Sequence, residues 1–77
     1  MELTIIASVI GVDFDKKTNE RITKYQAAML ENIDNKANYI CVKNIEASLH
    51  EQFIEDCKKI AQKQQNKSVN NINVIMI

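Results

Sequence analysis

The sequence predicts a small α/β domain with a three-stranded sheet, in which strands and helices alternate as β-α-β-α-β and one helix covers each face. Apolar, β-branched stretches lie at both ends and in the middle of the chain. Two stretches between them repeat apolar residues every three or four positions, as amphipathic helices do. Such alternation favours parallel strands joined by helical crossovers, here in the strand order 2-1-3. An α+β fold with an antiparallel last strand is the alternative.

The first predicted strand covers residues 3–14 and is rich in Val, Ile and Thr, which favour pleated strands. Both of its faces are apolar, as expected for a central strand with helices on both sides. Gly11, the only glycine of the protein, permits a bulge or a bend near the end of this strand. The two faces consist of Leu3, Ile5, Ala7 and Val9, and of Ile6, Ile10, Val12 and Phe14.

Residues 19–33 are predicted to form the first helix, because apolar residues recur there at helical spacing. Thr18 or Asn19 is a suitable N-cap. The polar stretch DNKAN that follows is typical of a turn, and YICVK, residues 39–43, is typical of a short strand. The apolar stripe of the helix consists of Ile22, Tyr25, Met29 and Ile33.

A second helix is predicted to end near Gln64, with Ser48 and Glu51 at the spacing of a capping box at its start. After the turn NKSVNN, the alternating stretch INVIMI predicts a terminal strand over residues 72–77. The inner face of the helix consists of Leu49, Phe53, Cys57 and Ile60.

Composition indicates one small domain, residues 1–77, with a formal net charge of zero. So short a chain buries only a modest core. Cys41 and Cys57 show neither the paired spacing of zinc sites nor the density of a disulfide scaffold, which favours a reduced, cytoplasmic protein. The apolar start follows the acidic Glu2 and is too short for a membrane span, so we expect no membrane segment. The abundance of Ile, Asn and Lys suggests a low-GC bacterium or a phage.

Several enzyme classes are excluded by the residues that are missing. One glycine cannot build a P-loop or a dinucleotide fingerprint. The only histidine, His50, falls within the apolar arc of the second predicted helix, where a partly buried structural role is the favoured interpretation. Zinc held by Cys41, His50 and Cys57 would lack a matched motif. We therefore expect no catalytic residues, no metal and no cofactor.

Asp13 and Asp15, followed by Thr18, are the candidate ligand-binding residues. In an open parallel sheet, ligands bind beyond the carboxyl end of the strand at which the strand order reverses, and two nearby carboxylates suit a cation such as Mg²⁺. The stretch DFDKKT resembles the DxDxT motif of haloacid-dehalogenase-like phosphotransferases, but Thr18 comes one residue late and the chain is too short for that family's later motifs. A turn or capping role for these aspartates is the favoured alternative.

Lys59, Lys63 and Lys67 recur every four residues and would form a basic ridge that could contact nucleic-acid phosphates. The zero net charge and the single arginine, Arg21, favour an ordinary solvated surface instead. Nucleic-acid binding is therefore a secondary hypothesis.

The last residues, Val74, Ile75, Met76 and Ile77, offer an apolar sheet edge without lysine or proline to discourage strand pairing. A symmetric dimer or the strand of a target protein would cover this edge, and packing within the chain is an equal alternative. We expect a non-catalytic interaction or regulatory protein that forms a homo-oligomer. An inhibitor or immunity factor of a phage or mobile element, acting by binding a partner protein, would fit this description.

Overall fold

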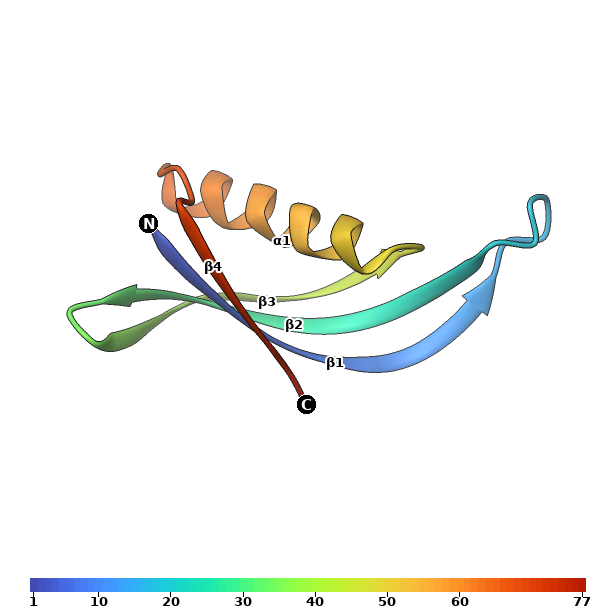
Figure 1. Ribbon diagram of the computed structural model, residues 1–77, viewed down its shortest axis with the longest axis horizontal. Coiled ribbons are helices and arrows are strands. Elements are labelled where there is room, and N and C mark those ends of the chain that lie inside the picture. Colours follow the sequence, from blue (N-terminus) through green and yellow to red (C-terminus); the bar gives the residue numbers. More distant parts are fainter.

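The structure, a computed structural model that describes residues 1–77, is a four-stranded sheet with a single helix on one of its faces (Figure 1). The strand order is β3-β2-β1-β4. The first three strands form an antiparallel meander, and the last strand is parallel to β1. This is a sheet-dominated α+β fold. Its elements are β1 (Glu2–Phe14), β2 (Arg21–Ile33), β3 (Lys36–Ala47), α1 (His50–Gln65) and β4 (Asn71–Met76).

The predicted three-stranded sheet with order 2-1-3 and a helix on each face is wrong. Residues 19–33, expected to be helical, form most of β2, so only one helix remains and only one face of the sheet is covered. The alternative of an antiparallel last strand is wrong as well, because β4 runs parallel to β1 with Ile72 opposite Leu3. The predicted strand over residues 39–43 lies within the longer β3, and the predicted terminal strand is confirmed as β4.

The alternation of β2 explains why helical spacing misled the prediction. Tyr25, Ala27, Met29 and Glu31 are buried at every second position, which is the period of a strand. Two of these residues mislead a strand prediction, because alanine (Ala27) is depleted in strands and glutamate (Glu31) is rarely buried. The β2–β3 turn is made by Asp34 and Asn35, whose φ angles are 50° and 63°. Positive φ at both central residues is the conformation of a tight type I′ hairpin turn.

The first predicted strand is confirmed as β1, and so is the bulge that Gly11 permits. The register with β2 shifts between Val9 and Gly11, which leaves Ile10 as an extra residue. The shift brings Val12 and Phe14 to the face that carries Val9, whereas simple alternation assigned them to the other face. Beyond this bulge, residues 9–24 form a distal hairpin that projects past the helix and gives the molecule an elongated shape of 45 × 23 × 16 Å (Figure 1).

The second predicted helix is confirmed as α1, but its predicted capping box is wrong. Leu49 occupies the N-cap position, and no side chain caps the helix start. The helix ends at Asn66, which has a left-handed conformation (φ 53°) and donates its N–H to the carbonyl oxygen of Gln62. Asparagine tolerates this conformation better than most residues, so it can end a helix where glycine is absent.

The hydrophobic core lies between α1 and the sheet. Phe53, Cys57 and Ala61 of α1 are fully buried against the covered sides of β1, β2 and β3. Phe53 stacks on Tyr25, with 3.9 Å between the ring centroids. Only 13 of the 77 residues are buried, so the core stabilises the fold by less than a larger domain would gain. The sheet residues of the core are Leu3, Ile5, Ala7, Tyr25, Ala27, Met29, Cys41, Ile45 and Ala47.

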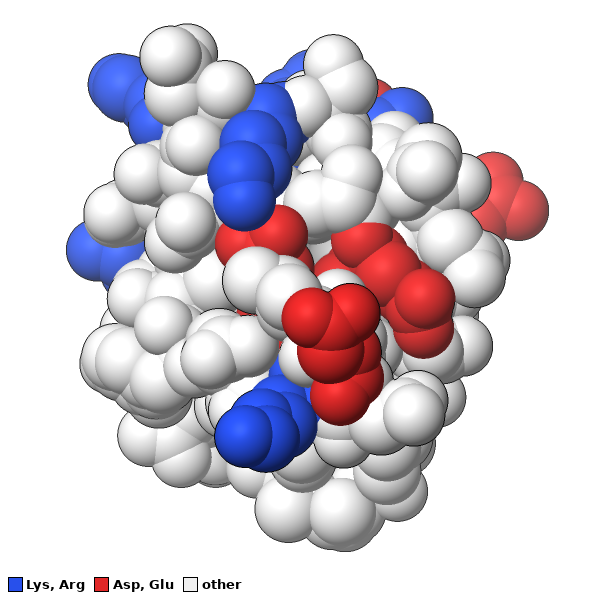
Figure 2. Space-filling model, turned by 90° about the vertical axis from the view of Figure 1, so that its left-hand side faces the viewer, with Lys and Arg blue, Asp and Glu red and all other residues white.

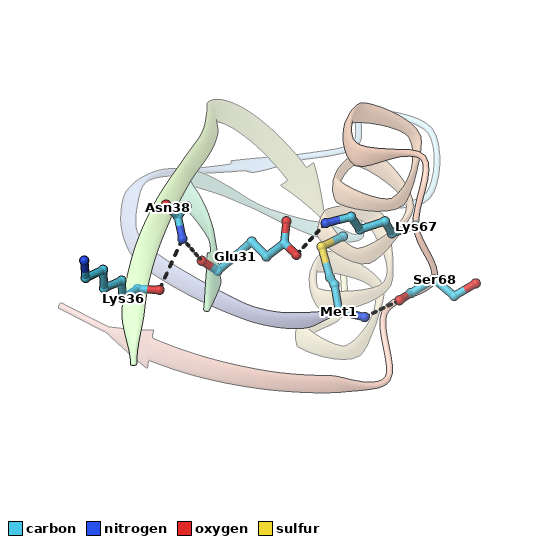
Figure 3. A network of polar contacts seen from close by, with 6 residues as sticks. All are labelled: Met1, Glu31, Lys36, Asn38, Lys67 and Ser68. Atoms are coloured by element: carbon cyan, nitrogen blue, oxygen red, sulfur yellow. Dashed lines mark hydrogen bonds and ion pairs between the residues drawn. The ribbon is translucent and has the colours of Figure 1, made fainter. Parts of the chain in front are cut away.

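Polar contacts hold the segment between α1 and β4 against the sheet (Figure 3). Glu31 is the only buried charged residue, and its Oε2 lies 3.0 Å from Nζ of Lys67. The amino group of Met1 donates to the carbonyl oxygen of Ser68 over 2.6 Å. Because a buried carboxylate is costly without a partner, the Glu31–Lys67 pair fixes where the chain turns into β4.

We predict that Lys67→Met lowers the free energy of unfolding by about 1–2 kcal/mol, because it leaves the Glu31 carboxylate buried without its cation. The value lies below that of a fully buried pair because half of the Lys67 side chain is exposed. Urea unfolding at fixed protein concentration measures the change. Lys63→Met removes the same charge from an exposed helix position without an ion pair, and should change stability by less than about 0.5 kcal/mol. Equal effects of the two substitutions would contradict the prediction.

Candidate protein interface

The sheet face opposite α1 is not covered by any part of the chain. We call its central part, where all four strands lie side by side, the uncovered face. Pairing and alternation place its side chains in rows across β3, β2, β1 and β4. None of these positions carries a charged side chain, although 26% of the residues of the protein are charged. The rows are Tyr39–Leu30–Thr4–Asn73, Val42–Ala28–Ile6–Ile75 and Asn44–Gln26–Ser8–Ile77.

Charged side chains lie at both ends of the uncovered face. Glu2 lies at the end near the β2–β3 turn. At the other end, Nζ of Lys24 lies 4.0 Å from Asp13 and 3.9 Å from Glu46. An apolar centre without charges and a polar border are the features that distinguish the core and the rim of protein interfaces.

A shallow hollow of about 290 Å³ lies in the middle of the uncovered face. Its floor is low because Ala28 and Ser8 have short side chains, while Ile6, Val42 and Ile77 stand beside them. Gln26 is its only other lining residue, so the hollow contains no ionisable group that could serve as a nucleophile, an acid or a base. Its apolar lining can accept an apolar side chain.

The sheet has three exposed edges, and β4 is the only one without a feature that discourages strand pairing. The edge of β3 contains a bulge at Ile40 and the charged residues Lys36, Lys43 and Glu46. Past the end of β4, the exposed edge of β1 carries the bulge next to Gly11. β4 pairs with β1 without a register shift and contains no charged residue and no proline. Bulges and edge charges are the usual protection against pairing with another chain.

The backbone of β4 presents unpaired hydrogen-bonding groups on its outer side. The N–H of Ile77 donates to the carbonyl oxygen of Ala7 over 2.8 Å, so the backbone of Ile77 points towards β1. Backbone groups of successive strand residues point to opposite sides, so Asn73 and Ile75 also point towards β1. The N–H and C=O groups of Ile72, Val74 and Met76 therefore point outward, where no strand accepts them.

Of the predicted ligand residues, Asp13 lies near the end of β1, opposite Ile22, whereas Asp15 and Thr18 lie in the connection between β1 and β2 at the tip of the distal hairpin. Oδ1 of Asp15 accepts hydrogen bonds from the backbone N–H groups of Lys17 (2.8 Å) and Thr18 (3.2 Å). Oδ1 of Asp13 accepts from the N–H of Phe14 over 2.8 Å. The expected crevice depended on the strand order 2-1-3 and does not form, because β1 continues into this hairpin. A ligand role for Asp13, Asp15 and Thr18 stays a prediction from the sequence.

The three lysines of the predicted ridge do not lie on one helix. Lys59 and Lys63 are exposed on α1, whereas Lys67 follows the helix end at Asn66 and pairs with Glu31. At the end of the molecule that contains the β2–β3 turn, blue and red side chains lie next to one another rather than in a field of one sign (Figure 2). Nucleic-acid binding through these lysines stays a prediction.

The predicted interface residues Val74 to Ile77 lie where the β4 edge meets the uncovered face. Ile75 and Ile77 point to the uncovered face, whereas Val74 and Met76 point to the side of α1. Ile75 is 49% exposed and Met76 is 44% exposed.

Sequence reasoning missed Ile6, Leu30, Tyr39 and Val42, which the same face brings together. The only signal for them was their alternation with buried residues, and it was hidden by assigning residues 19–33 to a helix.

The remaining chemically reactive groups do not form a site. No group of three or more His, Cys, Asp or Glu residues is arranged to hold a metal. Sγ of Cys41 lies 3.9 Å from Sδ of Met29, inside the core. Burial, with smaller contributions from Asp56 and Cys41, raises the pKa of Cys57 from 9.0 to about 12. A thiol that stays protonated is a poor nucleophile, so Cys57 acts as a small core residue. His50 is exposed at the start of α1.

Comparison of this chain with protein families, with curated proteins and with solved structures finds no match. The single helix is neither long nor apolar enough to cross a membrane.

The raised pKa of Cys57 predicts a loss of stability at high pH. The thiol ionises near 9.0 in the unfolded chain and near 12 in the folded protein, so between these values only the unfolded state releases the proton. The free energy of unfolding should therefore be unaffected below about pH 9 and fall above it, by up to about 1.4 kcal/mol per pH unit. Cys57→Ala lacks this contribution. Urea unfolding of both proteins under reducing conditions should show their stability difference shrinking as the pH rises, and a constant difference would contradict the prediction.

Proposed function

We propose that this protein is a non-catalytic interaction protein that self-associates by pairing the edge of β4 with β4 of a second copy. The observation that carries this proposal is the unprotected edge of β4, with the outward backbone groups of Ile72, Val74 and Met76. The two copies are related by a two-fold axis, so the paired strands are antiparallel. Together they form one continuous sheet of both chains.

The proposed pairing centres on Val74, which then lies opposite Val74 of the second copy. Ile72 lies opposite Met76 of that copy, and each such pair exchanges both backbone hydrogen bonds. The side chains of these residues are apolar and lie on the side of α1. On the other side of the sheet, Ile75 lies opposite Asn73 of the second copy. Like charges opposite one another would destabilise the pairing, and none meet along the two paired β4 strands.

Self-association would supply stability that the monomer lacks. β4 is the shortest strand, and its only backbone partner is β1. A second copy on its outer side satisfies the remaining backbone groups and shields the hydrogen bonds to β1 from water. Association with a second copy stabilises the folded state, and this stabilisation grows with the logarithm of the protein concentration above Kd. Association would therefore add to the stability that the small core provides.

A regulatory role as an inhibitor or immunity factor would use the same edge. The strand of a target protein would then replace that of the second copy and meet the same backbone groups of β4. In that case the isolated chain would be monomeric. The oligomeric state of the purified protein therefore separates the two occupants.

We predict that Met76→Pro reduces the number of copies in the assembly. Proline removes the outward N–H of residue 76 and places its ring where the backbone of the second copy would approach, while the bonds to β1 remain. Sedimentation equilibrium gives the mass, and circular dichroism verifies that the fold persists.

Met76→Ala is the matched control, because it removes the side chain but keeps the N–H. This variant should keep the mass of the native protein. A native protein that stays monomeric at millimolar concentration would contradict the proposed self-association. An assembly that survives Met76→Pro would exclude pairing through the β4 edge.

A further inference from the structure

The β4 edge by itself provides a small interface. A strand of six residues is about 20 Å long, and a sheet edge about 10 Å thick gives a footprint of about 200 Å² per copy. Stable interfaces bury about 800 Å² on each partner. An assembly held by the edge alone would be weak, so a second surface is needed for stable association.

We infer that the uncovered face is this second surface and that its occupant is the same face of another copy of this chain. The inference rests on the proposed self-association and adds a face-to-face contact between sheets to the contact between edges. Four strands spaced about 4.8 Å apart and rows about 6.8 Å apart give the uncovered face an area of about 400 Å². The face contact is thus about twice as large as the edge contact, and a copy that makes both buries about 600 Å² in total against its two neighbours.

The charge distribution favours a copy of the same chain over a foreign protein. Foreign partners are selected by complementary charges, and the rows of the uncovered face carry none. When a surface meets itself, any charge near the two-fold axis approaches its own copy and is repelled. The rows of the uncovered face carry no charged side chain, so like charges do not meet in its centre.

The shape of the uncovered face is also self-complementary. The hollow above Ala28 and Ser8 lies beside the larger side chains of Ile6, Val42 and Ile77 on the same face. A two-fold axis that runs along the strands between β1 and β2 places Ile6 of each copy over Ala28 of the other. Large side chains then fill hollows, as they do where two sheets pack about 10 Å apart.

The path to the uncovered face is open, and the face borders the proposed edge interface. The distal halves of β1 and β2 curve towards the side of the sheet that carries α1, so the distal hairpin bends away from an approaching copy (Figure 1). Ile75 and Ile77 belong to β4 and also to the uncovered face. Edge pairing therefore joins the uncovered faces of two copies into one larger apolar surface.

The experiment measures the mass of four proteins by sedimentation equilibrium: the native chain, Val42→Lys, Met76→Pro and the double variant. Val42 is 44% exposed and lies on β3, far from the β4 edge, so a lysine there charges the face without touching the edge. At millimolar concentration, native protein should form assemblies larger than a dimer, because each copy can pair at its β4 edge with one copy and pack its face on another. Each single variant should stop at a dimer, and the double variant should be a monomer. Leu49→Lys adds a lysine at an exposed apolar residue outside the face and should leave the mass unchanged. Tyr39→Lys serves as a second variant of the face if Val42→Lys fails to fold.

The outcomes separate the two proposals. If Val42→Lys and Tyr39→Lys keep the native mass while Met76→Pro reduces it, the inference is overturned and the edge proposal stands. If only the face variants reduce the mass, the face contact is supported and the edge proposal fails. A native monomer overturns both proposals. A loss of mass in Leu49→Lys equal to that in Val42→Lys would show that added charge disrupts the assembly regardless of place, and would also overturn the inference.

Discussion

The structure depends on the fact that one helix covers only one face of a four-stranded sheet. A helix is about 10 Å wide, and a sheet of four strands is about 19 Å wide, so α1 cannot shield even its own side completely. It lies mainly over β3, which leaves Met76 of β4 and Val9 of the distal hairpin partly exposed on the covered side. The other face has no cover at all. The core is small because of this arrangement, and the apolar residues that a second helix would have buried remain available for contacts between chains.

The position of β4 depends on contacts between residues that are far apart in the sequence. Glu31 is buried in β2, and its cation, Lys67, lies 36 residues later, just after α1. In the same segment, the carbonyl oxygen of Ser68 accepts a hydrogen bond from the amino group of Met1, and the N–H of Asn70 donates one to the carbonyl oxygen of Met1. The segment that follows α1 is thereby attached to β1 and β2. Because of this attachment, β4 begins beside β1. The parallel β1–β4 pair, and with it the exposed edge, follows from this attachment.

Sequence reasoning located β1, α1 and β4 because each has a strong local pattern and a clear boundary. It failed for β2, whose buried residues include Ala27, a good helix former, and Glu31, whose burial depends on the distant Lys67. Helical spacing of Ile22, Tyr25 and Met29 then outweighed the alternation of the same stretch. This one error removed the second antiparallel partner, added a helix and placed Asp13 and Asp15 at a crevice that does not exist. The edge strand that contains Val74 to Met76 could be predicted because it depends mainly on local alternation and the local lack of charge and proline, whereas the uncovered face requires the pairing of all four strands.

Edge and face are coupled through β4 itself. Ile75 and Ile77 supply side chains to the uncovered face, while Ile72, Val74 and Met76 supply backbone groups to the edge, so the alternation of one short strand serves two surfaces. In the proposed assembly, a copy paired at the edge would hold β4 in its extended conformation and thereby fix Ile75 and Ile77 for contact across the face. A copy packed on the face in turn restrains β4 against β1, which keeps the outward N–H groups aligned for pairing. Each contact thus lowers the entropy that the other must overcome, and the two surfaces should assemble cooperatively rather than independently.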